Sequence, residues 1–220
     1  MKIPRYVASL DLETRDFLPS AYVLAAGIAV FDVQTMQRVD SAEWLMGPDD
    51  ATQADRTIGA STDEWWAYSG SDPKYPSLVA RDHNWQVTNP VTLRDCCDQL
   101  EAFLAKYDRE KWNMPIAMRG PDFDYVIMTN VVRSYGYDRY PLLMRMMDSS
   151  RTIDRFYAAV DLPQASGFTL AQICPDGQYH KHIALHDAIE EGYHCARYYN
   201  FLSKIAVLPE VRAVIAEYTE

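Results

Sequence analysis

The stretch that decides the fold is Tyr6-Val-Ala-Ser-Leu-Asp-Leu-Glu-Thr14, which begins as an apolar strand and ends in two carboxylates. Alternate side chains of a strand point to the same face, so Asp11 and Glu13 should converge at the carboxyl end of a buried strand. Two like charges held out of water repel each other, and a divalent cation relieves that cost. The alternative is a strand that ends in an acidic turn. The metal interpretation therefore needs further carboxylates from elsewhere in the chain.

The composition is that of a globular protein. The chain has 220 residues, of which 48% are hydrophobic and 12% aromatic. This length predicts a single domain over residues 1–220, with a core over about 5–205 and a C-terminal helix over about 209–219. The net charge of -10 argues against a protein that coats duplex DNA through phosphate contacts alone. It does not exclude an enzyme whose metal ions meet the phosphate.

The cysteines and the hydropathy pattern predict a soluble cytoplasmic protein. Cys96, Cys97, Cys174 and Cys195 form no C-x-x-C pair, which favours reduced thiols over a disulfide framework or a zinc knuckle. The amino terminus leads directly into a strand without a signal-peptide pattern, and no apolar run reaches the length of a membrane span. We therefore expect no membrane partner.

The apolar pattern predicts an α/β fold with a central mixed five-stranded sheet flanked by helices. Strands are expected over residues 5–10, 21–32, 37–46, 114–118 and 142–147, and the first three should form a meander. Helices are expected from Ser61, over 77–82, after a Thr92 cap, over 123–135, over 152–159 after a Ser150 cap, over 169–173, over 184–205 and from Pro209.

Two further stretches carry candidate chemistry. Arg119-Gly-Pro-Asp-Phe-Asp124 follows a strand where a helix should begin, so Asp122 or Asp124 could face the strand ends, although one of them could simply cap the helix. His182-Ile-Ala-Leu-His-Asp187 precedes the long helix. Residues five apart in a helix are separated by about 140°, so His182 meets Asp187 only if it lies outside the regular helix. A histidine placed there can accept a proton at neutral pH.

The ordered set of Asp11, Glu13, Asp124, His182 and Asp187 resembles the DEDD exonuclease superfamily, in the branch that carries H-x4-D. More narrowly, the chain resembles the phage exonuclease A and bacterial 3′–5′ exoribonuclease-like group, which implies a phage or prophage relation. That likeness rests on the runs Ser61-Thr-Asp-Glu-Trp-Trp66, Arg119-Gly-x-x-Phe-Asp124 and Asp148-Ser-Ser-Arg-Thr152, and it covers about residues 5–200. Serines flank Asp148 and Arg151 where relatives often carry more charge.

The resemblance implies an RNase H-like fold and a 3′–5′ exonuclease that uses two ions, Mg²⁺ or Mn²⁺. It implies that Asp11, Glu13, Asp124 and Asp187 bind the metals, with Asp11 between both ions. His182 would take a proton from the attacking water, and nucleoside 5′-monophosphates would leave from the 3′ end of single-stranded RNA or DNA. Dimers among relatives allow a homodimer.

Several side chains are candidate substrate contacts, each with a plain structural alternative. Trp65 and Trp66 could stack on terminal bases, although at least one should be core. Tyr22 and Leu24 could wedge under the terminal base, although burial in the second strand explains them equally well. Arg119 and Arg151 could hold a phosphate or form surface ion pairs. The sequence pattern is compatible with both members of each pair of alternatives.

Other classes of function account for the same residues less completely. His180, His182, His186 and His194 could form a zinc site, but this leaves the carboxylates unexplained. A non-catalytic nucleic-acid-binding module would not need the full set of acidic residues. A phosphodiesterase that acts on small nucleotides would share the site but would not depend on the length of the nucleic acid.

Overall fold

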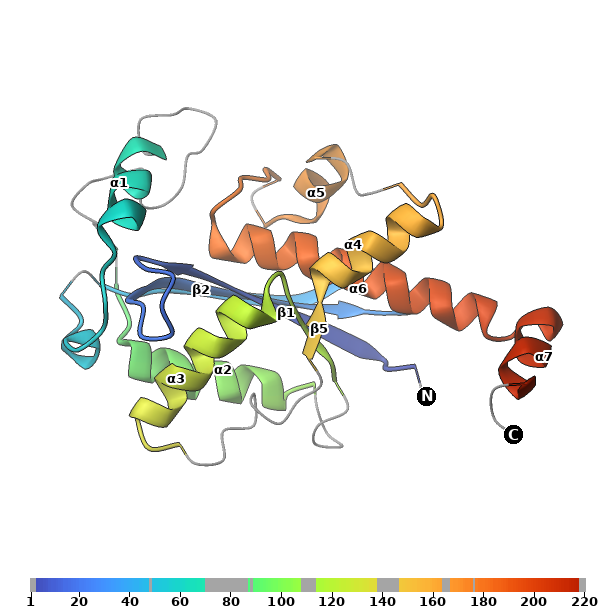
Figure 1. The fold of residues 1–220 in the computed structure, drawn as a ribbon, viewed down its shortest axis with the longest axis horizontal. Coiled ribbons are helices and arrows are strands. Elements are labelled where there is room, and N and C mark those ends of the chain that lie inside the picture. Colours follow the sequence, from blue (N-terminus) through green and yellow to red (C-terminus); the bar gives the residue numbers. More distant parts are fainter. Residues whose placement is uncertain are drawn as a thin grey trace.

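A mixed five-stranded sheet in the order β3-β2-β1-β4-β5 forms the centre of the computed structural model (Figure 1). Its strands are β1 (Tyr6–Thr14), β2 (Val23–Asp32), β3 (Arg38–Leu45), β4 (Ile116–Met118) and β5 (Met147–Ser149). β1, β2 and β3 form the expected antiparallel meander, while β4 lies parallel to β1 and β5 parallel to β4. The structure describes residues 3–47, 49–69, 87, 89–107, 114–137, 147–163, 167–175 and 177–217.

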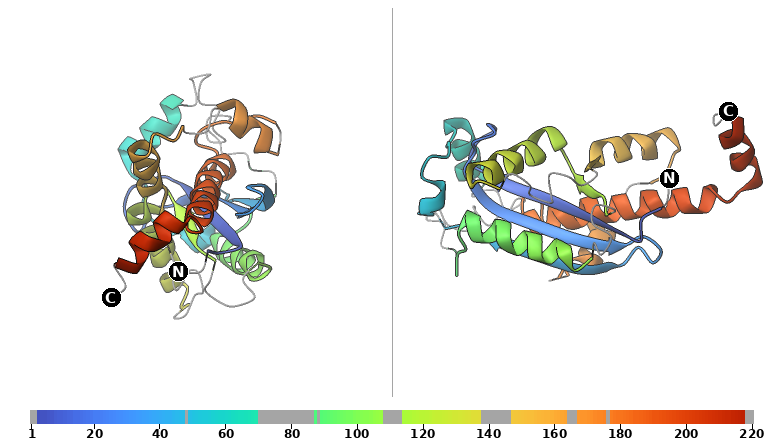
Figure 2. Two further views of the ribbon diagram at one scale, coloured as in Figure 1. Left: turned by 90° about the vertical axis from the view of Figure 1, so that its right-hand side faces the viewer. Right: turned by 90° about the horizontal axis from the view of Figure 1, so that it is seen from below.

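Helices cover both faces of the sheet. In chain order the helical elements are η1 (Ala51–Gln53), α1 (Ala60–Ser69), α2 (Leu93–Ala105), η2 (Pro121–Tyr125), α3 (Val126–Ser134), α4 (Ser150–Ala159), α5 (Gly167–Ile173), α6 (Ala184–Ile205) and α7 (Pro209–Glu217). α6 runs along one face beside α4, and α2 and α3 lie on the opposite face (Figure 1). α7 follows the far end of α6 and extends beyond the sheet (Figure 2). Among the described helices, none is long and apolar enough to cross a membrane.

The two faces of β1 have different chemistry because its side chains alternate. Ala8, Leu10 and Leu12 enter the apolar core with α2 and α3. The alternate residues face α6, where the Ser9 hydroxyl donates a hydrogen bond to the Ala188 carbonyl. Asp11 therefore lies on the α6 face of the sheet, as does Glu13.

Two glycines allow α6 to lie against the sheet. Gly27 pairs with Asp11 across β1 and β2, and a Cβ atom on Gly27 would come within 2.2 Å of the Ala184 carbonyl carbon. A Cβ atom on Gly192 would come within 2.8 Å of Phe31 and Ser9. Backbone atoms cannot yield to such overlaps, so glycine at position 27 lets the first turn of α6 lie next to Asp11.

Most element limits agree with the sequence-based expectations, and a few differ. Thr92 caps α2 as expected, because its hydroxyl accepts a hydrogen bond from the Asp95 amide. The expected Ser150 cap is wrong: Ser149 holds the N-cap position of α4 without a side-chain bond. β1 continues to Thr14 instead of ending at residue 10, because its pairing with β2 continues past the carboxylates. The helix expected at 77–82 and residues 142–146 of the expected fifth strand lie outside the described residues.

Candidate active site

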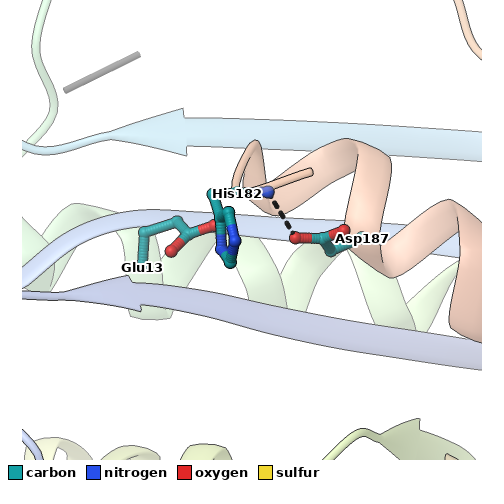
Figure 3. A group of neighbouring side chains, drawn as sticks. All are labelled: Glu13, His182 and Asp187. Atoms are coloured by element: carbon teal, nitrogen blue, oxygen red, sulfur yellow. Dashed lines mark hydrogen bonds between the residues drawn. The ribbon is translucent and has the colours of Figure 1, made fainter. Parts of the chain in front are cut away.

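Three side chains from distant parts of the chain meet at the carboxyl end of β1. Oxygen and nitrogen atoms of Glu13, His182 and Asp187 lie within 4.8 Å of one another, in an arrangement that could hold a metal ion (Figure 3). Glu13 comes from β1 and Asp187 from the first turn of α6. His182 comes from the turn that precedes this helix. The sheet and the helix thus bring the first and third sequence motifs together.

His182 lies outside the regular helix, which is the condition that its spacing from Asp187 imposes. Its backbone adopts a left-handed conformation with φ of 62°. The His182 amide donates a hydrogen bond of 2.7 Å to Oδ2 of Asp187, and this bond fixes the turn against the helix (Figure 3). Burial, followed by the charges of Lys181 and Arg119, lowers the pKa of His182. The imidazole is therefore neutral at pH 7 and can accept a proton.

Asp11 and Asp124 lie buried beside this group. Burial raises the pKa of Asp11 well above its usual value, and the charges of Asp124, Glu13 and Asp187 raise it further. Burial also raises the pKa of Asp124 to about 7, although hydrogen bonds from the Leu12 and Gly120 backbone oppose this rise. The second motif, which η2 carries, thus supplies a carboxylate to the same cluster. Each carboxylate raises the cost of ionising its neighbours.

The side chains present fit hard divalent cations. Oxygen ligands dominate the cluster, as Mg²⁺ and Mn²⁺ prefer. Within the described residues, no lysine or arginine forms an ion pair with Asp11 or Glu13. Burial and the charge of Glu190 raise the pKa of Asp187 to about 6, although hydrogen bonds from the His182 amide and the Tyr179 hydroxyl lower it. Bound cations would neutralise this concentration of negative charge.

Two arginines flank the cluster at its rim. The Arg119 guanidinium lies 3.9 Å from Glu190, and the Arg151 guanidinium lies 3.7 Å from Asp122. Both arginine side chains are about half exposed, and Asp122 is fully at the surface. Asp122 is therefore a rim residue, while Asp124 belongs to the cluster. Weak surface ion pairs of this kind leave both guanidinium groups able to exchange partners.

Helix α1 holds the two tryptophans in different environments. The Trp66 indole is buried and donates a hydrogen bond of 2.8 Å to the Thr14 carbonyl, directly after the acidic end of β1. Trp65 is 38% exposed, and its ring centroid lies 4.8 Å from that of His182 in an edge contact. The structure therefore makes Trp66 the core member of the pair and brings Trp65 to the histidine.

The structure buries two of the expected substrate contacts. Tyr22 donates a hydrogen bond of 2.5 Å to the Gly47 carbonyl, and Leu24 packs with Tyr22 and Trp66. This burial favours the alternative that both are core residues. The large exposed apolar side chains near this end of β1 are instead Phe17 and Leu18, at 71% and 52% exposure. Phe17 lies 6.0 Å from Phe123, the neighbour of Asp124, as measured between ring centroids.

The four histidines of the zinc alternative are engaged in different places. The His186 imidazole accepts a hydrogen bond of 3.1 Å from the His180 amide, whereas His182 lies beside Glu13. His194 lies two turns further along α6, 3.4 Å from Asp154. All four cysteines are buried and free, as expected. This separation argues against a histidine zinc site.

Sequence reasoning missed three side chains at the site. Tyr179 donates hydrogen bonds to Asp187, at 3.0 Å, and to Glu190. Glu43 of β3 accepts a hydrogen bond from the Leu185 amide at the start of α6. Glu191 lies four residues after Asp187 on the same helix and is fully buried. Of these three, only Glu191 could have been found from the sequence, because it lies four residues after Asp187 and residues four apart share a helix face.

The comparisons with solved structures agree with the fold. The nuclease domain of 3′hExo, a DEDDh family member bound to rAMP, has a TM-score of 0.55 at 10% identity and aligns over 92% of this chain and 93% of that one. The zinc-bound E. coli ExoI–ssDNA complex has a TM-score of 0.55 at 13% identity, over 92% of this chain and 41% of that one. Cell-death related nuclease 4 has a TM-score of 0.51 at 14% identity, over 90% and 65% of the two chains. The expected RNase H-like fold is therefore confirmed.

The family comparison covers nearly the whole chain. The model of the Rv2179c-like 3′–5′ exoribonuclease domain matches residues 7–200. No curated protein matches the chain. The matched range contains all three acidic motifs and ends near the end of α6. The chain therefore belongs to the Rv2179c-like 3′–5′ exoribonuclease domain family, and it is a 3′–5′ exonuclease, as the resemblance to the DEDDh branch implied.

Proposed function

We propose that this exonuclease shortens single-stranded RNA from its 3′ end, one nucleoside 5′-monophosphate at a time, with two divalent cations, Mg²⁺ or Mn²⁺. The observation that carries the proposal is the meeting of Glu13, His182 and Asp187 within 4.8 Å, beside buried Asp11 and Asp124. The family description, an exoribonuclease, supports RNA over DNA. We also propose that residues 1–220 form one exonuclease domain.

The carboxylates would hold the cations. Asp11 lies among the other acids and would contact both ions, while Glu13 and Asp187 would complete one position and Asp124 would support the other. Bound cations supply a positive clamp for the scissile phosphate and for the leaving 3′ oxygen. The net charge of -10 is compatible with a phosphate substrate, because neutralisation is local to the site.

His182 would act as the general base. Its imidazole is neutral at pH 7 because burial lowers its pKa, so it can take a proton from the attacking water. The hydrogen bond from its amide to Asp187 ties the base to a proposed metal ligand. The edge contact with the Trp65 ring would further restrain the imidazole. Attack in line with the leaving oxygen would then release the terminal nucleotide.

The rim of the site would hold the RNA end. Arg119 and Arg151 are half-exposed cations beside the acidic cluster and would contact backbone phosphates. Trp65 and Phe17 present exposed aromatic surface on α1 and on the loop after β1, and either could stack on a terminal base. The single-stranded preference follows because stacking of this kind requires unpaired bases.

The experiment that tests the proposal is digestion of 5′-labelled RNA and DNA oligomers of matched sequence, with Mn²⁺, Mg²⁺ or a chelator. We expect a ladder of products that shorten from the 3′ end, nucleoside 5′-monophosphates, faster cleavage of RNA and no reaction in chelator. The Asp11→Asn variant serves as the inactive control. Binding without cleavage would indicate a non-catalytic module, and cleavage of dinucleotides alone would indicate a small-nucleotide phosphodiesterase.

A further inference from the structure

Glu191 is a buried carboxylate that has no hydrogen-bond partner among the described residues. It lies on α6 one turn after Asp187, so the two side chains share a helix face. The residue is 1% exposed, and neither of its carboxylate oxygens has a hydrogen-bond partner in the described part of the chain. Burial of a carboxylate without a hydrogen-bond partner costs folding free energy, and a bound cation would offset this cost.

Glu191 lies among other carboxylates, which repel its negative charge. Its main electrostatic neighbours are Asp124 and Asp187, and it also acts on Asp11. These three carboxylates come from η2, α6 and β1, and the region they share is the acidic cluster. Glu191 therefore lies next to the acidic cluster, on the same helix face as Asp187, with both carboxylate oxygens buried and unpartnered in the described part of the chain.

Arg119 is a cation whose charge acts on Glu191, but no hydrogen bond joins the two side chains in the described structure. The Arg119 side chain is 49% exposed, and its closest described contact is the 3.9 Å ion pair with Glu190. Its interaction with Glu191 is therefore a long-range attraction between charges, without a hydrogen bond in the described structure. A guanidinium at the rim cannot supply the donors that a buried carboxylate needs.

We propose that Glu191 is a fifth carboxylate of the metal centre and strengthens divalent cation binding there, as a ligand or through a water on the cation. The inference rests on the proposed metal-dependent function, since it concerns the same site. Outer partners of metal sites commonly change metal affinity by about 10–100-fold when they are removed. Glu191 would also add negative charge that a second cation can offset.

The test compares Glu191→Gln with Asp148→Asn, both in the full chain. Glutamine keeps the shape of the side chain and removes its charge. Asp148 is a matched control because it is also a partly buried acid that packs against α6, but it is satisfied by the Tyr199 hydroxyl at 2.8 Å. The readouts are Mn²⁺ affinity by calorimetric titration and the melting temperature in chelator.

We expect Glu191→Gln to weaken Mn²⁺ binding by about 10-fold or more and to raise the melting temperature in chelator, because a buried repulsion is removed. Asp148→Asn should leave Mn²⁺ affinity unchanged and lower the melting temperature. If the glutamine variant does not fold, the Mn²⁺ affinity of Glu191→Asp tests the inference instead. Its carboxylate is withdrawn by one methylene group, so its Mn²⁺ affinity should also fall.

Unchanged Mn²⁺ affinity in the folded variant would overturn the inference. Failure of the inference about Glu191 and failure of the proposed function give different results. A wild-type protein that degrades RNA with Mn²⁺, together with a Glu191→Gln variant of normal affinity, contradicts only the role of Glu191. A wild-type protein whose Mn²⁺ binding depends on Glu191 but which leaves RNA intact contradicts only the proposed reaction.

Discussion

The two faces of β1 have opposite chemistry, one apolar and one acidic, although they belong to the same nine residues. Leu10 is fully buried among the apolar side chains of α2 and α3. Asp11, the next residue, faces α6 and a group of carboxylates. One face contributes hydrophobic stabilisation, and the other concentrates charge that opposes folding in the absence of cations. The comparison shows how a strand can hold a reactive cluster rigidly. The apolar face packs into the core and so fixes the position of the side chains on the acidic face.

The same difference explains why the protein can fold although the acidic face of β1 is buried. Desolvation and mutual repulsion raise the pKa values of Asp11 and Glu13 well above their usual range. The apolar face compensates by removing whole side chains from water, at roughly 1.5–3 kcal/mol for each large one. The site therefore depends on a stable core behind it, and the two faces should respond to substitution in opposite ways.

The largest effect is expected at Asp11. Asp11→Asn should lower kcat by about 10³-fold or more, because several kcal/mol of charge stabilisation from the cations is lost. The melting temperature in chelator should stay the same or rise, since a buried repulsion disappears. RNA digestion and thermal unfolding check the two parts. A variant with wild-type cleavage would remove Asp11 from the site.

The next effect concerns His182, the proposed general base. His182→Ala should lower the rate by about 10²–10⁴-fold at pH 7, because proton abstraction from water loses its acceptor. The loss should shrink at high pH, where hydroxide replaces the base. The measurement is single-turnover cleavage of the variant and the wild type between pH 6 and 9. A ratio that stays constant over this range would be inconsistent with a general base.

On the apolar face, Leu10→Ala should act on stability. Truncation of a fully buried leucine should lower the free energy of unfolding by about 2–5 kcal/mol. The residual folded protein should keep near-normal Mn²⁺ affinity and cleavage, because Leu10 points away from the cluster. Denaturant unfolding and activity at low temperature check this. A specific loss of Mn²⁺ binding would show that the two faces are not independent.

The smallest effect is expected at Trp65, which contacts the proposed base His182. Trp65→Ala should reduce kcat about 2- to 10-fold, as expected for the loss of one aromatic contact of 0.5–1.5 kcal/mol. Phe17→Ala should mainly raise KM, since Phe17 is exposed and its described ring contact is with Phe123. Steady-state kinetics separate the two. Equal changes of KM in both variants would argue against a restraint on His182.

Much of the fold could be predicted from local pattern. The limits of α6 and the Thr92 cap follow from periodicity and from hydrogen-bonding chemistry within a few residues. The alternation in β1 placed Asp11 and Glu13 on one face. Such features are local, so they do not depend on what the rest of the chain does.

The remaining features depend on tertiary contacts that a local pattern does not contain. Tyr22 lies just before β2, and its burial is decided by α1 and by the carbonyl of Gly47. The left-handed conformation of His182 accompanies the hydrogen bond from its amide to Asp187, where the loop meets the first turn of α6. Gly27 provides the space that the first turn of α6 occupies, and this role depends on residues that are distant in the sequence.

The most direct measurement of the central claim is the melting temperature in chelator and in excess Mn²⁺, from pH 5 to 8. In the folded protein the pKa of Asp187 is about 6 and that of Asp124 about 7, above the value of about 3.9 expected for an unfolded aspartate. Folded protein then binds more protons than the unfolded chain, so the stability from these groups is lost as pH rises through 6 and 7.

The account predicts that the melting temperature in chelator falls from pH 5 to 8, and that Mn²⁺ raises it more at pH 8, because cations replace the protons. The Asp11→Asn variant should show a shallower fall. Melting temperatures in chelator and in Mn²⁺ that stay parallel across this range would contradict a shared cation site built from these carboxylates.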